Sequence, residues 1–183
     1  METKIPTRDI IIIDTWKPDD YLKAKKINEI CLPENYSEEF WKKIYDSAPR
    51  FQFCASKRNS DGTMETVGYI LLWFDHVNID LDETIKYRYN ITIASLAVLP
   101  EYRRSGIASS LLEKVKYIAE IYNTTQKEAR IFNLELHVRE DNKEAQELYK
   151  KMGFTKVKEI PKYYSNPEKT AWVMQCSIYH TNK

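Results

Sequence analysis

Two arginines, one glycine and several small residues stand in the segment RRSGIA, Arg103–Ala108, at a predicted junction between a strand and a helix. The residues before it, ITIASLAVL, are typical of a strand, and LLEKVKYIAEIY after it is typical of an amphipathic helix. The N-terminus of a helix leaves backbone N–H groups unpaired and carries about half a positive charge, so it attracts anions. Gly106 lets a phosphate oxygen approach the main chain, and Arg103 and Arg104 add hydrogen-bond donors and charge.

Two interpretations of this segment stay open on local physics. The segment can be a cradle for a diphosphate-like group, or it can be a capped helix with two solvated arginines. A nucleotide-binding P-loop is disfavoured, because the pattern GxxxxGK[ST] does not occur in the chain.

Composition and charge narrow the class of protein. The 183 residues are 43% hydrophobic and 30% charged, which is typical of one soluble globular domain. The 28 Lys and Arg residues nearly balance the 27 Asp and Glu residues, which argues against a protein whose main function is to bind nucleic acid. The 13 tyrosines suit a surface that binds a partly polar ligand.

The cysteines, histidines and apolar runs exclude further classes. The three cysteines are far apart and form no CxxC, so neither a disulfide framework nor a zinc site is predicted. The three histidines also lack ligand spacing, so no metal is expected. No apolar run reaches the roughly 18 residues of a membrane span and no signal peptide is evident, which predicts a cytoplasmic protein without membrane contacts.

Apolar periodicity predicts helices and strands that alternate around one sheet, a mixed α/β domain. Strands are predicted at residues 10–13, 51–57, 66–74, 90–98, 132–138, 154–160 and 171–179, the first of them buried. Helices are predicted at residues 19–31, after an N-cap at Ser37, from Gly106, and at 142–152 with a stop at Gly153. Residues 78–88 lack periodicity and predict a loop, and a tyrosine-bearing loop at 162–164 is predicted between the last two strands.

Two motifs of the chain resemble the cofactor motifs of the GCN5-related N-acetyltransferase (GNAT) superfamily. Arg103–Ala108 resembles the pyrophosphate loop R/Q-x-x-G-x-G/A, and the segment from Asn142 through Ala145 and Tyr149 to Gly153-Phe154 resembles the second motif. The resemblance covers about residues 10–179 and implies one GNAT domain over 1–183. The implied fold is a mixed, mostly antiparallel central sheet flanked by helices, and the implied cofactor is acetyl-CoA, with CoA as product.

The resemblance also implies how the cofactor is held. A bulge would splay the strand at Ser95–Val98, so that the main chain of Leu96 and Val98 pairs with the pantetheine arm. Asn142 would bind that arm and Tyr149 would donate to the leaving sulfur, although the first is equally a helix N-cap and the second a core aromatic. The implied cofactor-binding residues are Leu96, Ala97, Val98, Arg103, Arg104, Ser105, Gly106, Ile107, Ala108, Ser109, Asn142 and Tyr149.

Within the superfamily the chain most resembles the N-terminal (Nα) protein acetyltransferases, above all the archaeal ones. LPENY at Leu32–Tyr36, SLAV with YRRSGIA at Ser95–Ala108, and the pair Tyr163-Tyr164 carry this resemblance. It implies that a free protein or peptide N-terminus attacks the thioester directly, and it allows an auxiliary subunit or the ribosome as a partner, although the near-neutral charge gives ribosome binding no support. The implied substrate-binding residues are Leu32, Pro33, Glu34, Tyr36, Tyr163 and Tyr164.

The attacking amine must be neutral, and this requirement sets how strong a base the enzyme needs. An α-amine has a pKa of about 7.7–8.0, against about 10.4 for lysine, so it needs only modest help from a base. His137 matches a base position of some relatives, and it is otherwise a strand histidine that faces solvent. Relatives carry Tyr or His where this chain has Thr92, which is no base; this favours His137 acting alone through ordered water, with Glu135 as the fallback.

Two other functions compete with this one. The first is a GNAT enzyme that acetylates lysine side chains or small amines. The second is an inactive scaffold subunit that binds acetyl-CoA, a hypothesis that Thr92 supports. The near-intact cofactor motifs argue against the scaffold, since an inactive subunit need not keep its cofactor site.

Overall fold

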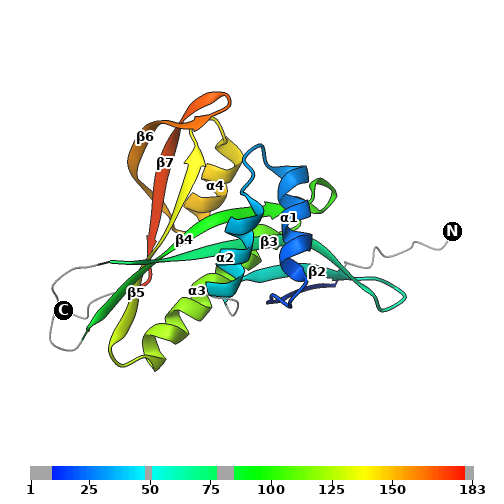
Figure 1. The fold of residues 1–183 in the computed structure, drawn as a ribbon, viewed down its shortest axis with the longest axis horizontal. Helices are drawn as coiled ribbons and strands as arrows, with labels where there is room; N and C mark the ends of the chain where they lie inside the picture. The colour runs from blue at the N-terminus through cyan, green and yellow to red at the C-terminus, as the bar shows by residue number, and fades with distance from the viewer. Residues whose placement is uncertain (1–9, 48–50, 78–84, 180–183) are drawn as a thin grey trace.

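The computed structural model describes residues 10–47, 51–77 and 85–179, which form one seven-stranded sheet in the order β1-β2-β3-β4-β5-β7-β6 (Figure 1). The strands are β1 (Ile11–Thr15), β2 (Phe53–Arg58), β3 (Met64–His76), β4 (Tyr87–Val98), β5 (Ala129–Arg139), β6 (Thr155–Ser165) and β7 (Glu168–Ser177). The helices are α1 (Asp20–Cys31), α2 (Glu38–Ser47), α3 (Ile107–Thr125) and α4 (Lys143–Lys151), with a 3₁₀ turn η2 (Pro100–Tyr102). Among the strands of these described residues, only β4 and β5 pair in parallel, so the predicted mixed, mostly antiparallel sheet is confirmed.

Helices cover both faces of the sheet, and a buried cluster lies under each layer (Figure 1). On one face, Ile70 and Leu72 of β3 pack in the cluster that contains α3 and α4. On the other face, Tyr69 and Leu71 pack in the cluster that contains α1 and α2. This alternation follows from the two-residue period of a strand, and burial on both faces explains why the centre of β3 is a continuous apolar run.

The long helix α3 has the spacing that the sequence predicted. Its buried residues form one stripe of Ile107, Leu111, Leu112, Val115 and Ala119. This stripe is the width expected of a helix that packs one face on a sheet. Within the described ranges, no helix is long and apolar enough to cross a membrane.

Strands β4 and β5 separate at the centre of the sheet. Their parallel pairing ends at Ile93 opposite Leu136, while β5 continues along β7 and β4 continues along β3. The register between β3 and β4 shifts by one residue here, because Leu71 pairs with Ser95 and Leu72 pairs with Ile93. Ala94 is therefore the extra residue of a β-bulge, which bends its strand and increases the local twist.

The predicted tyrosine loop at residues 162–164 is wrong. These residues lie inside β6, which pairs with β7 up to Ser165 opposite Glu168, so the turn comes later. The register of β6 shifts between Ile160 and Tyr164, and Lys162 has a φ of +56°. This irregularity and Pro161 interrupt the alternation that predicts a strand, so the strand predicted at 154–160 was ended too early.

Two other predicted elements also need correction. The predicted loop at 78–88 is too long at its end, since Tyr87 and Arg88 already belong to β4; residues 78–84 lie outside the described part of the chain. The predicted buried first strand is an edge strand: Ile12 is 42% exposed, because β1 has a neighbour on one side only. Four successive isoleucines do not distinguish a buried central strand from an edge strand, since both faces of an edge strand can be apolar.

Candidate active site

A groove of about 780 Å³ opens between the separated end of β4, the first turn of α3 and the helix α4. Eleven of the predicted cofactor-binding residues line it: Leu96, Ala97, Val98, Arg103, Arg104, Gly106, Ile107, Ala108, Ser109, Asn142 and Tyr149. Ser105 does not line it, and its hydroxyl donates to the carbonyl of Tyr102 at 2.5 Å. Leu32, predicted on the substrate side, lines the groove as well.

The start of α3 has the conformation of an anion cradle. Gly106 caps the helix with a φ of +88°, and no atom lies within 4 Å of the Cβ that a larger residue would place there. The glycine is therefore required by its left-handed conformation and not by crowding. Ser110 closes the first helical hydrogen bond to Gly106 at 3.0 Å, which leaves the preceding N–H groups for a ligand.

The two arginines of this segment differ. Arg103 Nε donates to the carbonyl of Val98 at 3.1 Å, which ties the turn to the end of β4. Arg104 has a φ of +62°, which is uncommon outside glycine and occurs at functional sites. Both side chains are exposed; Arg103 has a hydrogen bond within the turn, and the left-handed backbone at Arg104 is compatible with the cradle interpretation.

The main chain at the end of β4 points into the gap between β4 and β5. The N–H of Leu99 donates to Val67 in β3 at 2.9 Å, so the next residue back, Val98, turns its N–H and carbonyl away from β3. Leu96 has the same orientation by the two-residue period. Arg103 and the Cys31 thiol, 3.5 Å away, already contact the carbonyl of Val98, and its N–H faces the gap.

Tyr149 and Asn142 both line the groove, and each also has a structural role in α4 or the core. Tyr149 is 9% exposed, packs on Phe154 with ring centroids 5.8 Å apart, and also lines the groove. Burial raises the pKa of Tyr149 to about 12, so the phenol stays protonated and is a hydrogen-bond donor at neutral pH. The Asn142 side chain accepts from the N–H of Ala145 at 3.1 Å as the N-cap of α4.

The segment between α1 and α2 is attached to the sheet at the bulge. The Tyr36 hydroxyl donates to the carbonyl of Ala94 at 2.8 Å, and its ring stacks on Phe40 with centroids 4.2 Å apart. Pro33 is exposed in the same segment. Tyr36, one of the predicted substrate-side residues, therefore lies beside the point where β4 leaves β5.

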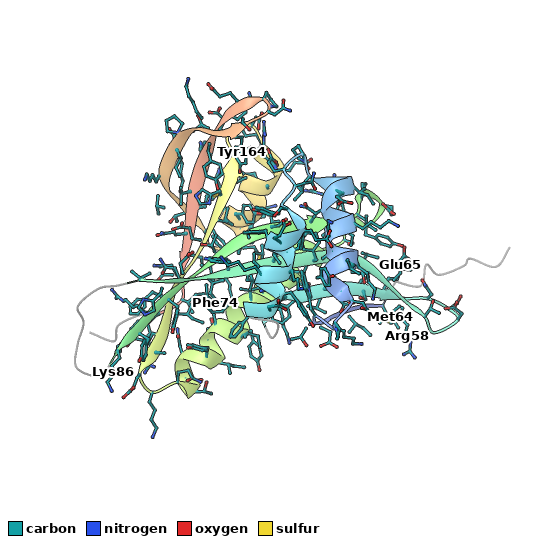
Figure 2. The ribbon with its side chains drawn as sticks, viewed as in Figure 1. Arg58, Met64, Glu65, Phe74, Lys86 and Tyr164 are labelled. Carbon is teal, nitrogen blue, oxygen red and sulfur yellow. The ribbon has the colours of Figure 1, made fainter. Side chains whose placement is uncertain are left out.

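Arg139 links the two sides of the site, and the sequence reasoning missed it. Its Nη1 donates to Glu34 at 2.6 Å, and its guanidinium lies over the ring of Tyr164, 5.0 Å from the centroid. Tyr164 lies where the β6–β7 hairpin approaches the α1–α2 segment (Figure 2). The available signal was an arginine at the end of the strand that carries the predicted base His137.

His137 lies face to face with Tyr163. The ring centroids are 4.7 Å apart and the planes are 4° from parallel. Burial lowers the pKa of His137, against an opposing effect of the Glu135 carboxylate, so the imidazole is neutral and can accept a proton near pH 7. Glu135 itself accepts from Gln175 Nε2 at 2.6 Å.

Gly68 of β3 is a second residue that the sequence reasoning missed. A Cβ there would lie 3.1 Å from the carbonyl oxygen of Ala97 and 3.2 Å from a methyl group of Val98. The first helical residue, Ile107, would be 3.4 Å away. A glycine inside a strand pattern often marks such a close approach, and here it lets β3 support the wall of the groove.

Comparisons with known proteins agree with this geometry. A model of the acetyltransferase (GNAT) family matches residues 21–154. The chain is 35% identical over 144 residues to an N-alpha-acetyltransferase of Sulfurisphaera tokodaii, covering 78% of this chain and 79% of that protein. It is 34% identical over 151 residues to an N-alpha-acetyltransferase of Saccharolobus solfataricus, covering 82% and 83%. The structure of Arabidopsis thaliana NAA60 in complex with acetyl-CoA shares the fold with a TM-score of 0.77 at 21% identity, covering 92% and 100%.

Proposed function

Because the chain belongs to the acetyltransferase (GNAT) family, we propose that it transfers the acetyl group of acetyl-CoA to the free α-amine of protein N-termini. One observation carries the proposal. The gap between β4 and β5 joins a groove that suits CoA to a face where Tyr163 stacks on His137 and the Tyr36 hydroxyl binds the carbonyl of Ala94 at the bulge. The archaeal relatives that match over about four fifths of the chain are named for this activity.

The residues of the groove fit acetyl-CoA. The first turn of α3 offers N–H groups, and Arg103 and Arg104 offer cationic donors, for a pyrophosphate. The main chain of Leu96 and Val98 would hold the pantetheine arm in the gap, since their polar groups point away from β3. When bound, acetyl-CoA supplies an activated thioester carbon.

The chain's own residues manage the proton transfers. His137 accepts the proton that the amine loses as the N–C bond forms, either directly or through one water. Tyr149 donates a hydrogen bond to the sulfur as the C–S bond breaks. An α-amine suits this modest base, because its pKa of about 7.7–8.0 leaves part of it neutral at pH 7, while lysine at about 10.4 is almost fully charged.

Glu34, Tyr36, Tyr163 and Tyr164 are proposed to contact the first residues of the acceptor. An auxiliary subunit, ribosome binding and a cytoplasmic location stay predictions from the resemblance and the composition.

The test is CoA release from acetyl-CoA with a panel of peptides. Free N-termini beginning Ser, Ala, Met-Leu and Met-Glu are compared with one N-blocked peptide that carries an internal lysine. We expect turnover of the free N-termini only, and its loss in His137→Ala. Turnover of the blocked peptide alone would show that the enzyme acetylates lysine side chains instead. Binding of acetyl-CoA without any turnover would support the scaffold alternative.

A further inference from the structure

Thr92 is held by a carboxylate that no part of the proposed mechanism uses. Its Oγ1 donates to Asp75 Oδ2 at 2.7 Å. The other carboxylate oxygen, Asp75 Oδ1, accepts from the indole Nε1 of Trp73 at 2.8 Å. The three residues lie on β3 and β4, with Trp73 opposite Thr92 in the register. Both oxygens of Asp75 thus have a defined donor, which fixes the direction of the Thr92 hydrogen.

This arrangement lies beside the proposed base. Thr92 pairs with Glu135 across the parallel β4–β5 ladder, and His137 is two residues further along β5, on the same face. A strand spacing of about 4.8 Å and a rise of about 3.3 Å per residue put the Cα atoms of Thr92 and His137 about 8 Å apart. Side chains on one face of a sheet at such a separation can share one bridging water.

A threonine hydroxyl has one hydrogen and two lone pairs. Since the hydrogen of Thr92 is bound to Asp75, the oxygen presents only lone pairs to the site. A water beside it must then donate a hydrogen bond to Thr92, and this sets the directions of the water's second hydrogen and of its lone pairs. The same hydroxyl without Asp75 could turn its hydrogen toward the water and reverse this orientation.

We propose that Asp75 is a positioning residue: through Thr92 it orients the water that carries the proton from the attacking amine to His137. The inference rests on the proposed function. The water donates one hydrogen to Thr92 Oγ1 and one to the unprotonated nitrogen of His137, and its lone pair faces the amine N–H. As the amine nitrogen bonds to the acetyl carbon and the C–S electrons leave with sulfur, the amine proton passes to the water and a water proton passes to His137.

Four variants test the inference. Thr92→Val removes the hydroxyl and keeps the shape, while Thr92→Ser keeps the hydroxyl. Asp75→Asn keeps an acceptor for Trp73 but gives Thr92 a donor, which turns the Thr92 hydrogen toward the site. The fourth variant combines Asp75→Asn with Thr92→Val. Asp61→Asn is the matched control, because Asp61 Oδ1 accepts from the Thr63 hydroxyl at 2.6 Å in the remote β2–β3 turn.

We expect kcat to fall roughly ten-fold in Thr92→Val and in Asp75→Asn, about the effect of one lost hydrogen bond. The double variant should lose no more than the larger single loss, and Thr92→Ser should recover most of the kcat that Thr92→Val loses. Acetyl-CoA affinity by calorimetry, the KM for the peptide and the midpoint of thermal unfolding should change little in the single variants. Asp61→Asn should match wild type in all of these quantities.

Several outcomes would overturn the inference. An active wild type with unchanged kcat in Asp75→Asn or Thr92→Val would refute it alone and leave the proposed function standing. Additive losses in the double variant, or losses confined to the unfolding midpoint, would show that Asp75 is only structural. A wild type that turns over no peptide would refute the proposed function, and the inference with it.

Discussion

Gly106 gives the sharpest test of the cofactor groove. The change is Gly106→Ala, at a residue with a φ of +88° and no neighbour within 4 Å of the new Cβ. Steric crowding is therefore absent, and the cost is the left-handed conformation alone, about 1–2 kcal/mol for a non-glycine residue. The free space around the new methyl is the space in which a pyrophosphate would contact the first turn of α3.

Gly62 offers a matched control for this change. It has a φ of +84° and also nothing within 4 Å of a Cβ, but it lies in the turn between β2 and β3, away from the groove. The two alanine variants carry the same backbone strain. We expect both to lower the free energy of unfolding by about 1–2 kcal/mol.

Only Gly106→Ala should weaken acetyl-CoA binding, by about ten-fold, because the methyl keeps a phosphate oxygen from the main chain; ten-fold corresponds to about 1.4 kcal/mol. Chemical denaturation measures the stability of both variants, and calorimetric titration measures the affinity. An affinity that stays at the wild-type value in both variants would refute the placement of the pyrophosphate at this helix. A loss of affinity in Gly62→Ala as large as in Gly106→Ala would show that strain alone reduces binding.

Three further predictions concern the catalytic and substrate sides. Arg139→Gln should raise the peptide KM, because Glu34 and Tyr164 lose their common partner; since Glu34 is 42% exposed, chemical denaturation should show a loss of only about 1 kcal/mol in unfolding free energy. Tyr149→Phe keeps the buried ring and should lower kcat in the CoA-release assay while calorimetry finds the acetyl-CoA affinity unchanged. The pKa of His137 is lowered by burial, so its base form persists below pH 6.5; kcat/KM should rise with pH through that lowered pKa, and His137→Gln should remove this step from the profile. Unfolding free energy should respond with the same sign: the contribution of His137 is complete above about pH 6.5 and is lost as the pH falls through the lowered pKa.

Local patterns were sufficient for much of the fold. The spacing of Ile107, Leu111 and Val115 predicted α3 and its buried face, and the parity of the β5 leucines put His137 on the opposite face, where the structure has it. These predictions succeeded because each depends only on the period of one helix or one strand.

Features that depend on distant pairs were beyond such patterns. Glu34 and Arg139 are 105 positions apart, and Asp75 and Thr92 are 17 positions apart on neighbouring strands, so nothing local connects them. The second half of β6, which contains Tyr163, was missed for a different reason, because the register shift removes the alternation. The bulge does have a signal in the sequence. Strict alternation after Ile91 and Ile93 would place the next apolar residue at position 95, but the apolar residues are Leu96 and Val98, one position later.

The bulge at Ala94 opens the gap beside β5 without changing which side chains of β4 face the hydrophobic core. On one face of β4 lie Ile91, Ile93, Leu96 and Val98, and a chain lacking Ala94 would keep all four on that face in unbroken alternation. Such a chain would pair with β3 in a regular register and lose the carbonyl that Tyr36 contacts. A deletion of one codon is therefore expected to conserve the hydrophobic core while closing the gap beside β5. Among natural homologues, we expect the gap to be open where two residues separate the positions of Ile93 and Leu96, and closed where only one residue separates them.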